Sequence, residues 1–475
     1  MSGEPCTQEN PLPPRAFSTI YWPVETKVRE LDAALLLAAI AARRGWSVVI
    51  GGKTELYRRL KQNAEPGIFI DKSIQKRSEE LFTVLKRKGH RVYARCEEGL
   101  WFATPVDYCN RKTGPGAIRE VEGFLAWGQE HARAVSQVYP EHAHKVFATG
   151  NVRSDLMTPA VRGFYAADVS RIKQEWGDFY LLNTKFAKIN YIKRGPAGGF
   201  VESHIAKGHA PNEEQVRLTT NSVAKEKAVL PHFIEFVQRF AAELPGEKLI
   251  IRPHPAEDFA FWQKLAEGKA NIHVVHQGPV QPWLLASKLS ISSDCTTSLE
   301  AYLLDKPGIN FRPYKDDEVE WIVPTVAAYQ IESTDEMLRV LASSDPRSMM
   351  SLPDAPIAEI VGRYVAQSGG NLAANAILDH FADVHVARQR GNGPADSPLG
   401  TPNLPFIAMQ RLKVFVAWCM SKDNRARHRN RAHKFRGLQQ AEVAARLDAI
   451  CRTLQYDDIR VRQVADNIFH VDQAR

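Results

Sequence analysis

Two adjacent carboxylates are the first residues whose type and spacing could catalyse a reaction. Glu97 and Glu98 stand before Gly99 and directly after a β-branched and aromatic run, residues 91–94. Two carboxyl groups at the end of a strand suit proton abstraction or nucleophilic attack, because mutual repulsion and partial burial raise the pKa of one of them. A solvated turn is the alternative interpretation, and the pair by itself is compatible with both.

A histidine between two prolines closes a second strand-like run. The sequence Arg252-Pro253-His254-Pro255 follows residues 248–251. Proline fixes its own backbone and restricts the residue before it, so we expect the imidazole to stay at the edge of the sheet. Such a histidine can donate to a phosphate oxygen and stabilise its departure, with Arg252 and Pro255 in the same site. A turn histidine that caps the strand fits the same pattern.

A cluster of hydroxyl groups is the third candidate. Its residues are Ser292, Ser293, Asp294, Cys295, Thr296, Thr297 and Ser298. Small hydroxyl residues between a buried strand and a helix let backbone N–H groups approach an anion at the positive end of the helix. An ordinary N-cap explains one hydroxyl group but not five in seven residues. The cluster, with Glu300 one turn after Thr296, therefore predicts an anion site.

Weaker candidates follow the first predicted strand of each half of the chain. They are Lys27, Arg29, Glu30, Asn183 and Lys185. In the first half, we expect Lys27, Arg29 and Glu30 to enter the cleft, where the cationic pair could meet the carboxylate of an acidic sugar. A salt-bridged helix start explains the same pair equally well.

Strand-like runs alternate with amphipathic helical windows, which predicts parallel strands joined by helices. The predicted strands are 18–22, 47–50, 67–70, 91–94, 123–127 and 145–150, then 179–184, 248–255, 271–276, 289–294 and 308–313. The main predicted helices of the second half are 213–243, 258–267, 296–304 and 357–382. Because ligands bind beyond the carboxyl ends of such strands, we expect an α/β fold of two doubly wound, Rossmann-like domains that face a cleft.

The length of 475 residues exceeds the size of a single hydrophobic core and favours two domains. The predicted boundaries are a disordered leader at 1–16, an acceptor domain at 17–176, a nucleotide-sugar domain at 177–385, and a linker with a basic helical tail at 386–475. The leader is polar and proline-rich, without the apolar run of a secretory signal.

Composition narrows the class of protein further. No segment approaches the roughly 20 apolar residues that span a bilayer, and the six cysteines form no Cys-x-x-Cys pair. We therefore expect a cytoplasmic protein with reduced thiols. The chain also lacks the Asp-x-Asp pair that usually holds a divalent cation, so we expect no metal and no cofactor beyond a nucleotide-sugar co-substrate.

One basic stretch stands apart from the predicted core. Residues Lys422 to Arg436 hold seven Lys or Arg against one Asp, within a chain of formal net charge +8. A solvated basic face is one interpretation, and attachment to the anionic inner-membrane surface or to an acidic polymer is the other. We expect no nucleic-acid partner.

The three motifs together resemble those of bacterial GT-B sialyltransferases and capsule-type Kdo transferases, which use CMP-activated ulosonic acids. The resemblance implies that Glu97 or Glu98 is the catalytic carboxylate and that His254 contacts the donor phosphate. It also implies that Ser292 and Ser293 hold that phosphate.

The span 292–313 resembles the nucleotide-binding element of UDP-GlcNAc 2-epimerases and CDP-glycerol polymerases. In that resemblance Glu300 takes the place of a ribose-binding acid, and Lys306-Pro307 starts the next strand. Over residues 17–380 the chain also resembles bacterial surface carbohydrate biosynthesis proteins. The segments that carry this likeness read IYWPVETKVRELDAALLLA, GIFIDKS, EEGL, AWG, TGNVRSDL and LLNT.

The sequence thus predicts a metal-independent GT-B glycosyltransferase of surface polysaccharide biosynthesis. Its expected donor is a CMP-activated acid such as Kdo or a sialic-like sugar, and its acceptor a glycan or a lipid-linked glycan. Two enzyme alternatives on the same fold are a UDP-sugar epimerase and a CDP-polyol phosphotransferase. A non-catalytic GT-B scaffold that recruits a membrane assembly is the alternative from another class.

Overall fold

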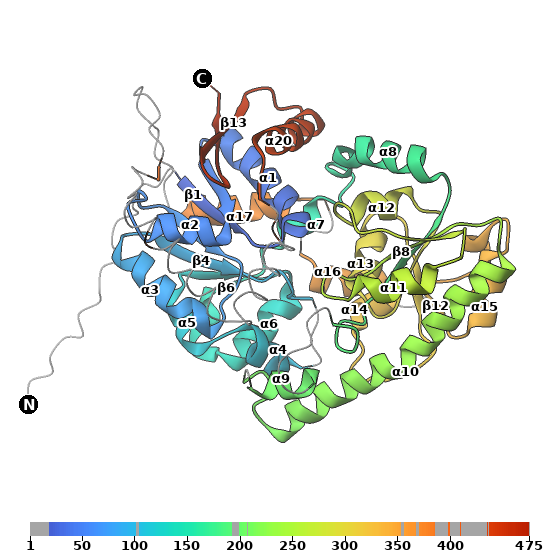
Figure 1. The fold of residues 1–475 in the computed structure, drawn as a ribbon. Coiled ribbons are helices and arrows are strands. Elements are labelled where there is room, and N and C mark those ends of the chain that lie inside the picture. The colour runs from blue at the N-terminus through green and yellow to red at the C-terminus, as the bar shows by residue number, and fades with distance from the viewer. Residues whose placement is uncertain are drawn as a thin grey trace, which may run out of the picture.

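Two α/β lobes stand side by side in the computed structural model (Figure 1). The structure describes residues 19–100, 104–191, 199–206, 208–352, 356–366, 370–384, 398–399, 409, 435 and 437–474. The predicted leader at 1–16 lies outside the described residues. So does the basic stretch Lys422 to Arg436, apart from Phe435.

The first lobe is built on a twisted sheet with the strand order β13-β14-β2-β1-β3-β4-β5-β6 among the described residues. Its strands are β1 (Thr19–Val24), β2 (Ser47–Gly52), β3 (Ile68–Asp71), β4 (Arg91–Arg95), β5 (Gly123–Leu125), β6 (Val146–Phe147), β13 (Ile459–Ala465) and β14 (Ile468–Gln473). Strands β1 to β6 run parallel, whereas β14 pairs antiparallel with β2. Every residue of β1 and β2 is buried, as expected of parallel strands covered by helices on both faces.

Helices cover both faces of this sheet. They are α1 (Lys27–Arg43), α2 (Lys53–Leu60), α3 (Glu79–Arg87), α4 (Pro105–Lys112), α5 (Pro115–Glu120), α6 (Gln129–Val138) and α7 (Val152–Asp155), whereas the next helix, α8 (Ala166–Trp176), packs on α12 (Gln281–Ala286) of the second lobe. Helix α1 is buried from Glu30 to Ala42, because it packs on the sheet and is covered by later helices. Gly45, with φ +84°, follows it in the left-handed conformation that commonly ends helices.

The second lobe contains a parallel sheet with the order β12-β11-β10-β7-β8-β9. Its strands are β7 (Tyr180–Asn183), β8 (Leu249–Arg252), β9 (Ile272–Val274), β10 (Ser290–Ser292), β11 (Ile309–Phe311) and β12 (Tyr329–Ile331). The chain builds outward from β7 in one direction and then returns to add β10 on its other side. The topological switch point, where ligands of doubly wound sheets bind, therefore lies between β7 and β10.

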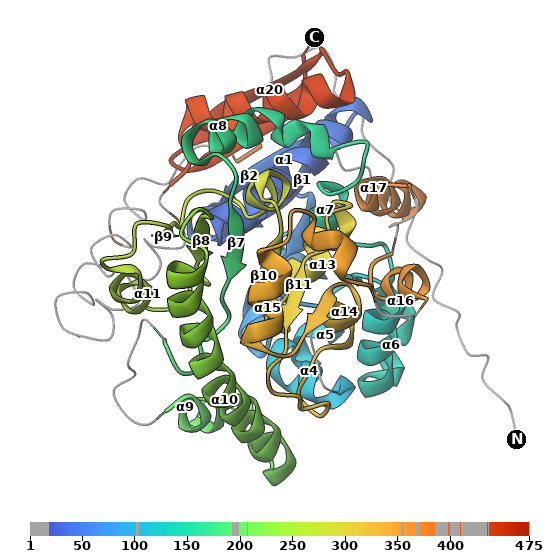
Figure 2. The same ribbon diagram turned by 90° about the vertical axis from the view of Figure 1, so that its right-hand side faces the viewer.

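The helices of the second lobe include a long one along its outer side (Figure 2). They are α9 (Phe200–Ala206), α10 (Glu213–Glu243), α11 (Phe259–Ala266), α12 (Gln281–Ala286), α13 (Thr296–Leu303), α14 (Ile322–Val326) and α15 (Thr334–Leu341). Asn212 caps α10 by accepting a hydrogen bond from the N–H of Gln215. The predicted helix at 213–243 is confirmed.

The chain then returns to the first lobe, which corrects the predicted domain limits. Helices α16 (Ile357–Tyr364) and α17 (Ala373–Val384), expected as one helix of the second domain, pack on α6 and on α1 with α7. Helix α20 (Gln440–Leu454) packs on α1, and the β13–β14 hairpin extends the first sheet. The described part of the predicted basic tail is therefore a structural part of the first domain.

Two doubly wound domains that face a cleft form the GT-B arrangement, so the predicted fold class is confirmed. Each predicted strand from 18–22 to 308–313 has its counterpart among β1 to β11. Among the described residues, no helix combines the length and the apolar character needed to cross a membrane.

Candidate active site

A cleft of about 420 Å³ lies between the two domains. It is bordered by loops that follow β4 and β5 of the first sheet and β7, β8, β9 and β10 of the second. Because these are carboxyl ends of parallel strands, the motifs from distant parts of the chain converge there. The predicted residues that line the cleft are Arg29, Glu97, Glu98, Asn183, Lys185, Arg252, His254, Pro255, Thr296, Thr297 and Glu300.

The loop after β4 owes its shape to a glycine. A Cβ atom on Gly99 would overlap the ring of the buried His131, so this position must remain without a side chain. Trp127, after β5, holds the same loop by donating its Nε1–H to the carbonyl of Cys96 at 2.6 Å. The Glu-Glu-Gly sequence therefore fits one backbone path that presents both carboxylates to the cleft.

The two carboxylates have different surroundings. The side chain of Glu97 is only 3% exposed and pairs with Arg95, with Nη1 of Arg153 at 3.6 Å from its Oε2. The side chain of Glu98 is 35% exposed and pairs with Lys112 and, at 3.6 Å, with Arg29. Each carboxylate thus has its own cations.

The sequence predicts that repulsion between the two carboxylates raises the pKa of one of them. Glu98 is not that carboxylate. Burial alone would raise the pKa of Glu98, but Lys112 and Arg29 hold it well below its usual range. Glu98 is therefore ionised in the ligand-free protein, and its basicity is restrained by the two cations.

Of the three candidates at the start of α1, only Arg29 lines the cleft. Lys27 donates from Nζ to the carbonyl of Gly437 at 3.0 Å and pairs with Glu442 of α20 at 2.5 Å. Glu30 is buried and accepts from Nζ of Lys72 at 2.8 Å. The expectation that these two residues enter the cleft is therefore wrong, because both bind neighbouring elements of the first domain.

The loop after β8 holds His254 in a defined orientation. The backbone N–H of Ala256 donates to Nδ1 of His254 at 3.2 Å. A neutral ring with an acceptor at Nδ1 carries its proton on Nε2, so the remaining nitrogen is a hydrogen-bond donor. His254 and Pro255 both line the cleft on the second domain's side.

A buried carboxylate that the sequence analysis missed supports this loop. Glu257 accepts hydrogen bonds from the N–H of His254 at 3.1 Å and from the hydroxyl of Thr184 at 2.7 Å. It also accepts from the N–H of Phe186 at 3.1 Å and from Nε1 of Trp262 at 2.8 Å. Glu257 therefore links the ends of β7 and β8. Its position three residues after His254 is the feature of the sequence that could have indicated this role.

Arg252 lines the cleft but binds the protein itself. Its guanidinium donates to the carbonyls of Gln277 at 2.8 Å and Gly278 at 3.1 Å. Burial lowers the pKa of Arg252 to about 9. The residue thus shapes the loop after β9, and its predicted contact with a nucleotide remains a prediction.

Some residues of the hydroxyl cluster line the cleft, and others lie in the protein interior. Thr296 and Thr297 form the first turn of α13 and line the cleft, where the N–H groups of a helix start lack partners within the helix. Ser292 and Ser298 are buried and bond to each other at 2.8 Å, so they fix the loop and do not line the cleft.

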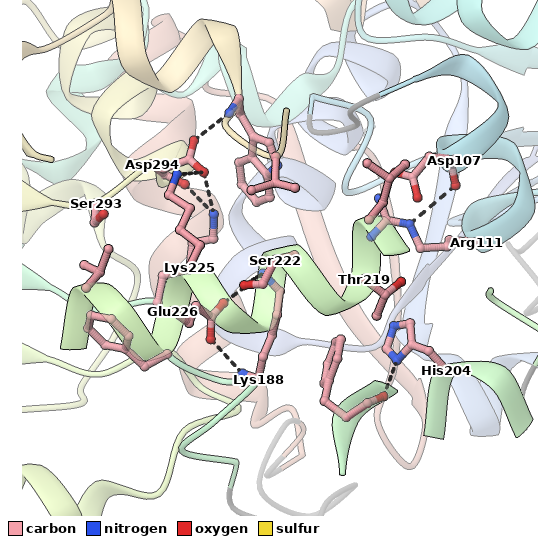
Figure 3. Close-up of a pocket in the computed structure, with 17 residues that line it drawn as sticks. Asp107, Arg111, Lys188, His204, Thr219, Ser222, Lys225, Glu226, Ser293 and Asp294 are labelled. Atoms are coloured by element: carbon pink, nitrogen blue, oxygen red, sulfur yellow. Dashed lines mark hydrogen bonds and ion pairs between the residues drawn. The ribbon is translucent and has the colours of Figure 1, made fainter. Parts of the chain in front are cut away.

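Ser293 and Asp294 line a small recess of about 80 Å³ beside the cleft. Figure 3 shows Lys225 pointing toward Asp294, Lys188 toward Glu226, and Arg111 toward Asp107. The predicted Lys185 lines both cavities and donates to the carbonyl of Asp294 at 2.5 Å. The cations of this recess thus already have carboxylate partners.

An ion pair at the cleft joins the first domain to the second. Arg153 of α7 donates from Nη2 to Oε1 of Glu300 in α13 at 3.1 Å, and Gln281 donates to the other carboxylate oxygen at 2.9 Å. Burial raises the pKa of Glu300, although Arg153 and Arg29 act against it. The sequence analysis missed Arg153, even though it lies within the quoted segment TGNVRSDL.

The described cleft lining carries more positive than negative charge. Its cations are Arg29, Arg111, Lys112, Arg153, Lys185, Lys188 and Arg252, and its carboxylates are Glu97, Glu98, Glu226 and Glu300. Such a lining favours an anionic ligand. Within the described residues, no group of His, Cys, Asp and Glu side chains has an arrangement that could hold a metal ion.

Comparisons with known proteins give similarities of structure only. No protein-family model matches the sequence, and a search of curated proteins gives no match. A UDP-GlcNAc 2-epimerase from Methanocaldococcus jannaschii is 12% identical with a TM-score of 0.46, covering 77% of this chain and 99% of that chain. The wall teichoic acid polymerase TagF is 9% identical with a TM-score of 0.48, covering 77% and 88%. A glycosyltransferase from Rickettsia africae is 10% identical with a TM-score of 0.44, covering 78% and 98%.

Proposed function

We propose that the protein is a glycosyltransferase of surface polysaccharide biosynthesis. It transfers a sugar, preferably Kdo or a sialic-like ulosonic acid, from a CMP donor to a glycan or lipid-linked acceptor. The observation that carries the proposal is the convergence, in one net positive cleft, of hydrogen-bond donors from the second domain and an ionised carboxylate from the first.

The second domain supplies the groups suited to the departing phosphate. His254 and the first turn of α13, with Thr296 and Thr297, lie on the same side of the cleft. Donors fixed in place before the reaction stabilise charge as it develops, without a cost of reorganisation at that moment. The dipole of α13 adds a positive potential at the same place.

The first domain supplies the carboxylate. In the proposed step, Glu98 removes the proton of an acceptor hydroxyl, whose oxygen bonds to the anomeric carbon of the donor. The bond from that carbon to the phosphate oxygen breaks, and CMP departs with the electron pair. Binding of the donor's own carboxylate between Arg29 and Lys112 would draw these cations away from Glu98 and raise its pKa toward the usual range.

A thermal-shift panel of CMP, CDP, UDP and GDP tests this function. A ligand that binds only the folded state raises the melting temperature by mass action, so CMP at millimolar concentration should stabilise the protein most. A response to UDP without one to CMP would favour the epimerase alternative. The absence of any response would favour the non-catalytic scaffold.

The variant His254→Ala tests the mechanism in the same preparation. Its turnover with a CMP-sugar should fall by on the order of 100-fold, far more than its donor affinity, because the imidazole acts as the bond breaks. The matched control is His273→Ala, since this histidine on β9 packs against Trp176 and does not line the cleft. Wild-type turnover in His254→Ala would contradict the mechanism, and unfolding of that variant would make the histidine structural.

A further inference from the structure

Arg153 joins the two walls of the cleft through its guanidinium. It lies on α7 of the first domain, and its side chain is only 12% exposed. Its Nη1 donates to the backbone carbonyl of Glu97 at 3.1 Å, and its Nη2 donates to Oε1 of Glu300 on α13 at 3.1 Å. One side chain therefore connects the loop after β4 to the helix whose first turn lines the opposite wall.

The carbonyl that Arg153 binds belongs to the peptide unit that joins Glu97 to Glu98. The N–H of the same unit, that of Glu98, donates to Sγ of Cys96 at 3.4 Å. Because a peptide unit is planar, bonds at its carbonyl and at its N–H together fix its rotation. The direction in which the side chain of Glu98 leaves the backbone is then fixed as well.

The two carbonyls of this loop are held from different domains. The carbonyl of Cys96 accepts from Nε1 of Trp127, in the first domain, at 2.6 Å. The carbonyl of Glu97 accepts from Arg153, whose guanidinium is bound in turn by the carboxylate of Glu300 in the second domain. The second domain thus contributes, through Arg153, to the position of the residue that follows.

Arg153 bears on Glu98 through geometry more than through charge. Its guanidinium bonds to the backbone just before Glu98 and pairs with the carboxylate of Glu300. Burial acts to raise the pKa of Glu98, and Lys112 and Arg29 are the main groups that lower it. A change at Arg153 should therefore move the side chain of Glu98 with little effect on its ionisation.

We propose that Arg153 is a positioning residue, which holds the Glu97–Glu98 peptide unit from Glu300 and so keeps the carboxylate of Glu98 directed into the cleft. This inference rests on the proposed function, because it takes Glu98 as the base of the transfer step. It also implies that the base is in place only while the two domains keep the arrangement in which Arg153 reaches Glu300.

Two variants of Arg153 separate geometry from charge. Arg153→Lys keeps a positive charge beside Glu97 and Glu300 but loses the planar fork that reaches two acceptors at once. Arg153→Met leaves both buried carboxylates without that charge, so it should lower the melting temperature more than the lysine variant does. A lysine variant that is as destabilised as the methionine variant would make Arg153 a structural residue and overturn the inference.

Arg162 of the first domain provides the matched control, because it binds the other end of α13. Its Nη1 donates to the carbonyl of Leu304 at 3.2 Å and pairs with Asp305 at 2.5 Å. Arg162→Lys therefore makes the same substitution in a second contact between the domains, one that does not involve the Glu97–Glu98 peptide unit. We expect this variant to behave like the wild type in exchange and in turnover.

Hydrogen exchange of the ligand-free protein tests the position of the loop without any reaction. In Arg153→Lys, peptides that cover residues 95–100 should exchange about 10-fold faster, because the peptide unit loses the bond at its carbonyl and opens more often. Exchange that equals that of the wild type would show that Arg153 does not hold this peptide unit. The inference would then be overturned, whatever donor the protein uses.

Turnover with a CMP-sugar tests whether Arg153 acts through Glu98. Arg153→Lys should lower kcat by about 10-fold, with little change in the KM of the donor, because a misplaced base slows the chemical step. The acidic limb of its pH profile should stay in place. In the Glu98→Gln background the same substitution should cause no further loss, since residues that act as one unit are not additive.

The outcomes distinguish this inference from the proposed function. An equal loss of kcat in both backgrounds would make Arg153 structural, and a shifted acidic limb would make its effect one of charge. Either result overturns the inference while turnover by the wild type still supports the proposed function. Wild-type protein without CMP-sugar turnover, together with faster loop exchange in Arg153→Lys, would count against the proposed function alone. The absence of both turnover and an exchange response would overturn both.

Discussion

The two walls of the cleft differ in how far their polar groups are already satisfied. On the first domain's wall, Glu98 lies between two cations, and the buried Glu97 pairs with Arg95. On the second domain's wall, the buried Glu257 behind the loops after β7 and β8 accepts four hydrogen bonds.

The two walls therefore hold their functional groups in different ways, the second by hydrogen bonds and the first by ion pairs. The second wall rests on a carboxylate, Glu257, that fixes its loops by hydrogen bonds before a ligand arrives. The first wall holds its carboxylate in ion pairs, so its reactivity depends on what draws the cations away. We therefore expect changes on the first wall to act mainly on charge, and changes on the second mainly on binding geometry.

The two domains also differ because the C-terminal residues 437–475 form part of the first domain only. Deleting these residues should have the largest effect. This segment supplies the β13–β14 hairpin, which pairs with β2, and helix α20, whose Val443, Leu447 and Ile450 are buried. Burying three such side chains contributes about 5–9 kcal/mol, which is comparable to the whole stability of a domain. Calorimetry of the truncated protein should show the first domain unfolded while the second retains a transition.

The matched control replaces the seven Lys and Arg of Lys422 to Arg436 by glutamine and keeps the rest of the chain. Its melting temperature should equal that of the wild type, and its binding to anionic vesicles tests the membrane interpretation of this stretch. A truncated protein that melts like the wild type would show that the first domain, like the second, folds without residues 437–475.

The neighbouring carboxylates of the first wall should separate by readout. Glu98→Gln should lower turnover by on the order of 100-fold and lower the melting temperature less than Glu97→Gln does, because it removes a base whose side chain is 35% exposed. Glu97→Gln should instead destabilise the fold by about 3 kcal/mol, because the buried Arg95 loses its compensating charge. Turnover and thermal melts of both variants provide the measurement. The reverse assignment, with Glu97 needed for turnover and Glu98 for folding, would break the comparison of the two walls.

Most of the fold could be predicted from the sequence because its strands are buried and apolar. Runs such as 47–50 and 67–70 are β-branched, and Asn212 caps α10 where the helical pattern begins. The β13–β14 hairpin could not, because its first strand carries Arg460 and Arg462 at an edge of the sheet. Its pairing with β2, more than 400 residues earlier in the chain, leaves no local signal.

The candidate site could be predicted only where a motif lies at a strand end. His254 and Thr296 lie in such positions and do line the cleft. Ser292 does not, because in an alternating strand and loop one hydroxyl of a pair turns inward, here toward Ser298. Arg153 was missed because its role depends on the distance between two domains, which no single stretch of sequence encodes.

The smallest expected effect is a shift in pH dependence on removing one cation of the first wall. Lys112 and Arg29 lower the pKa of Glu98, so Lys112→Met should let this pKa rise toward its usual value. Because kcat/KM falls when the free enzyme's base is protonated, the acidic limb of its pH profile should move to higher pH by about one unit. The stability that the ionised Glu98 contributes is present above its unfolded pKa and is lost as the pH falls through its folded value, so the variant should lose part of it near neutral pH.

Lys61→Met removes an exposed lysine and should change neither the pH profile nor the stability. An acidic limb that stays in place in Lys112→Met would mean that Glu98 is not the base, and the charge-based view of the first wall would fail with it.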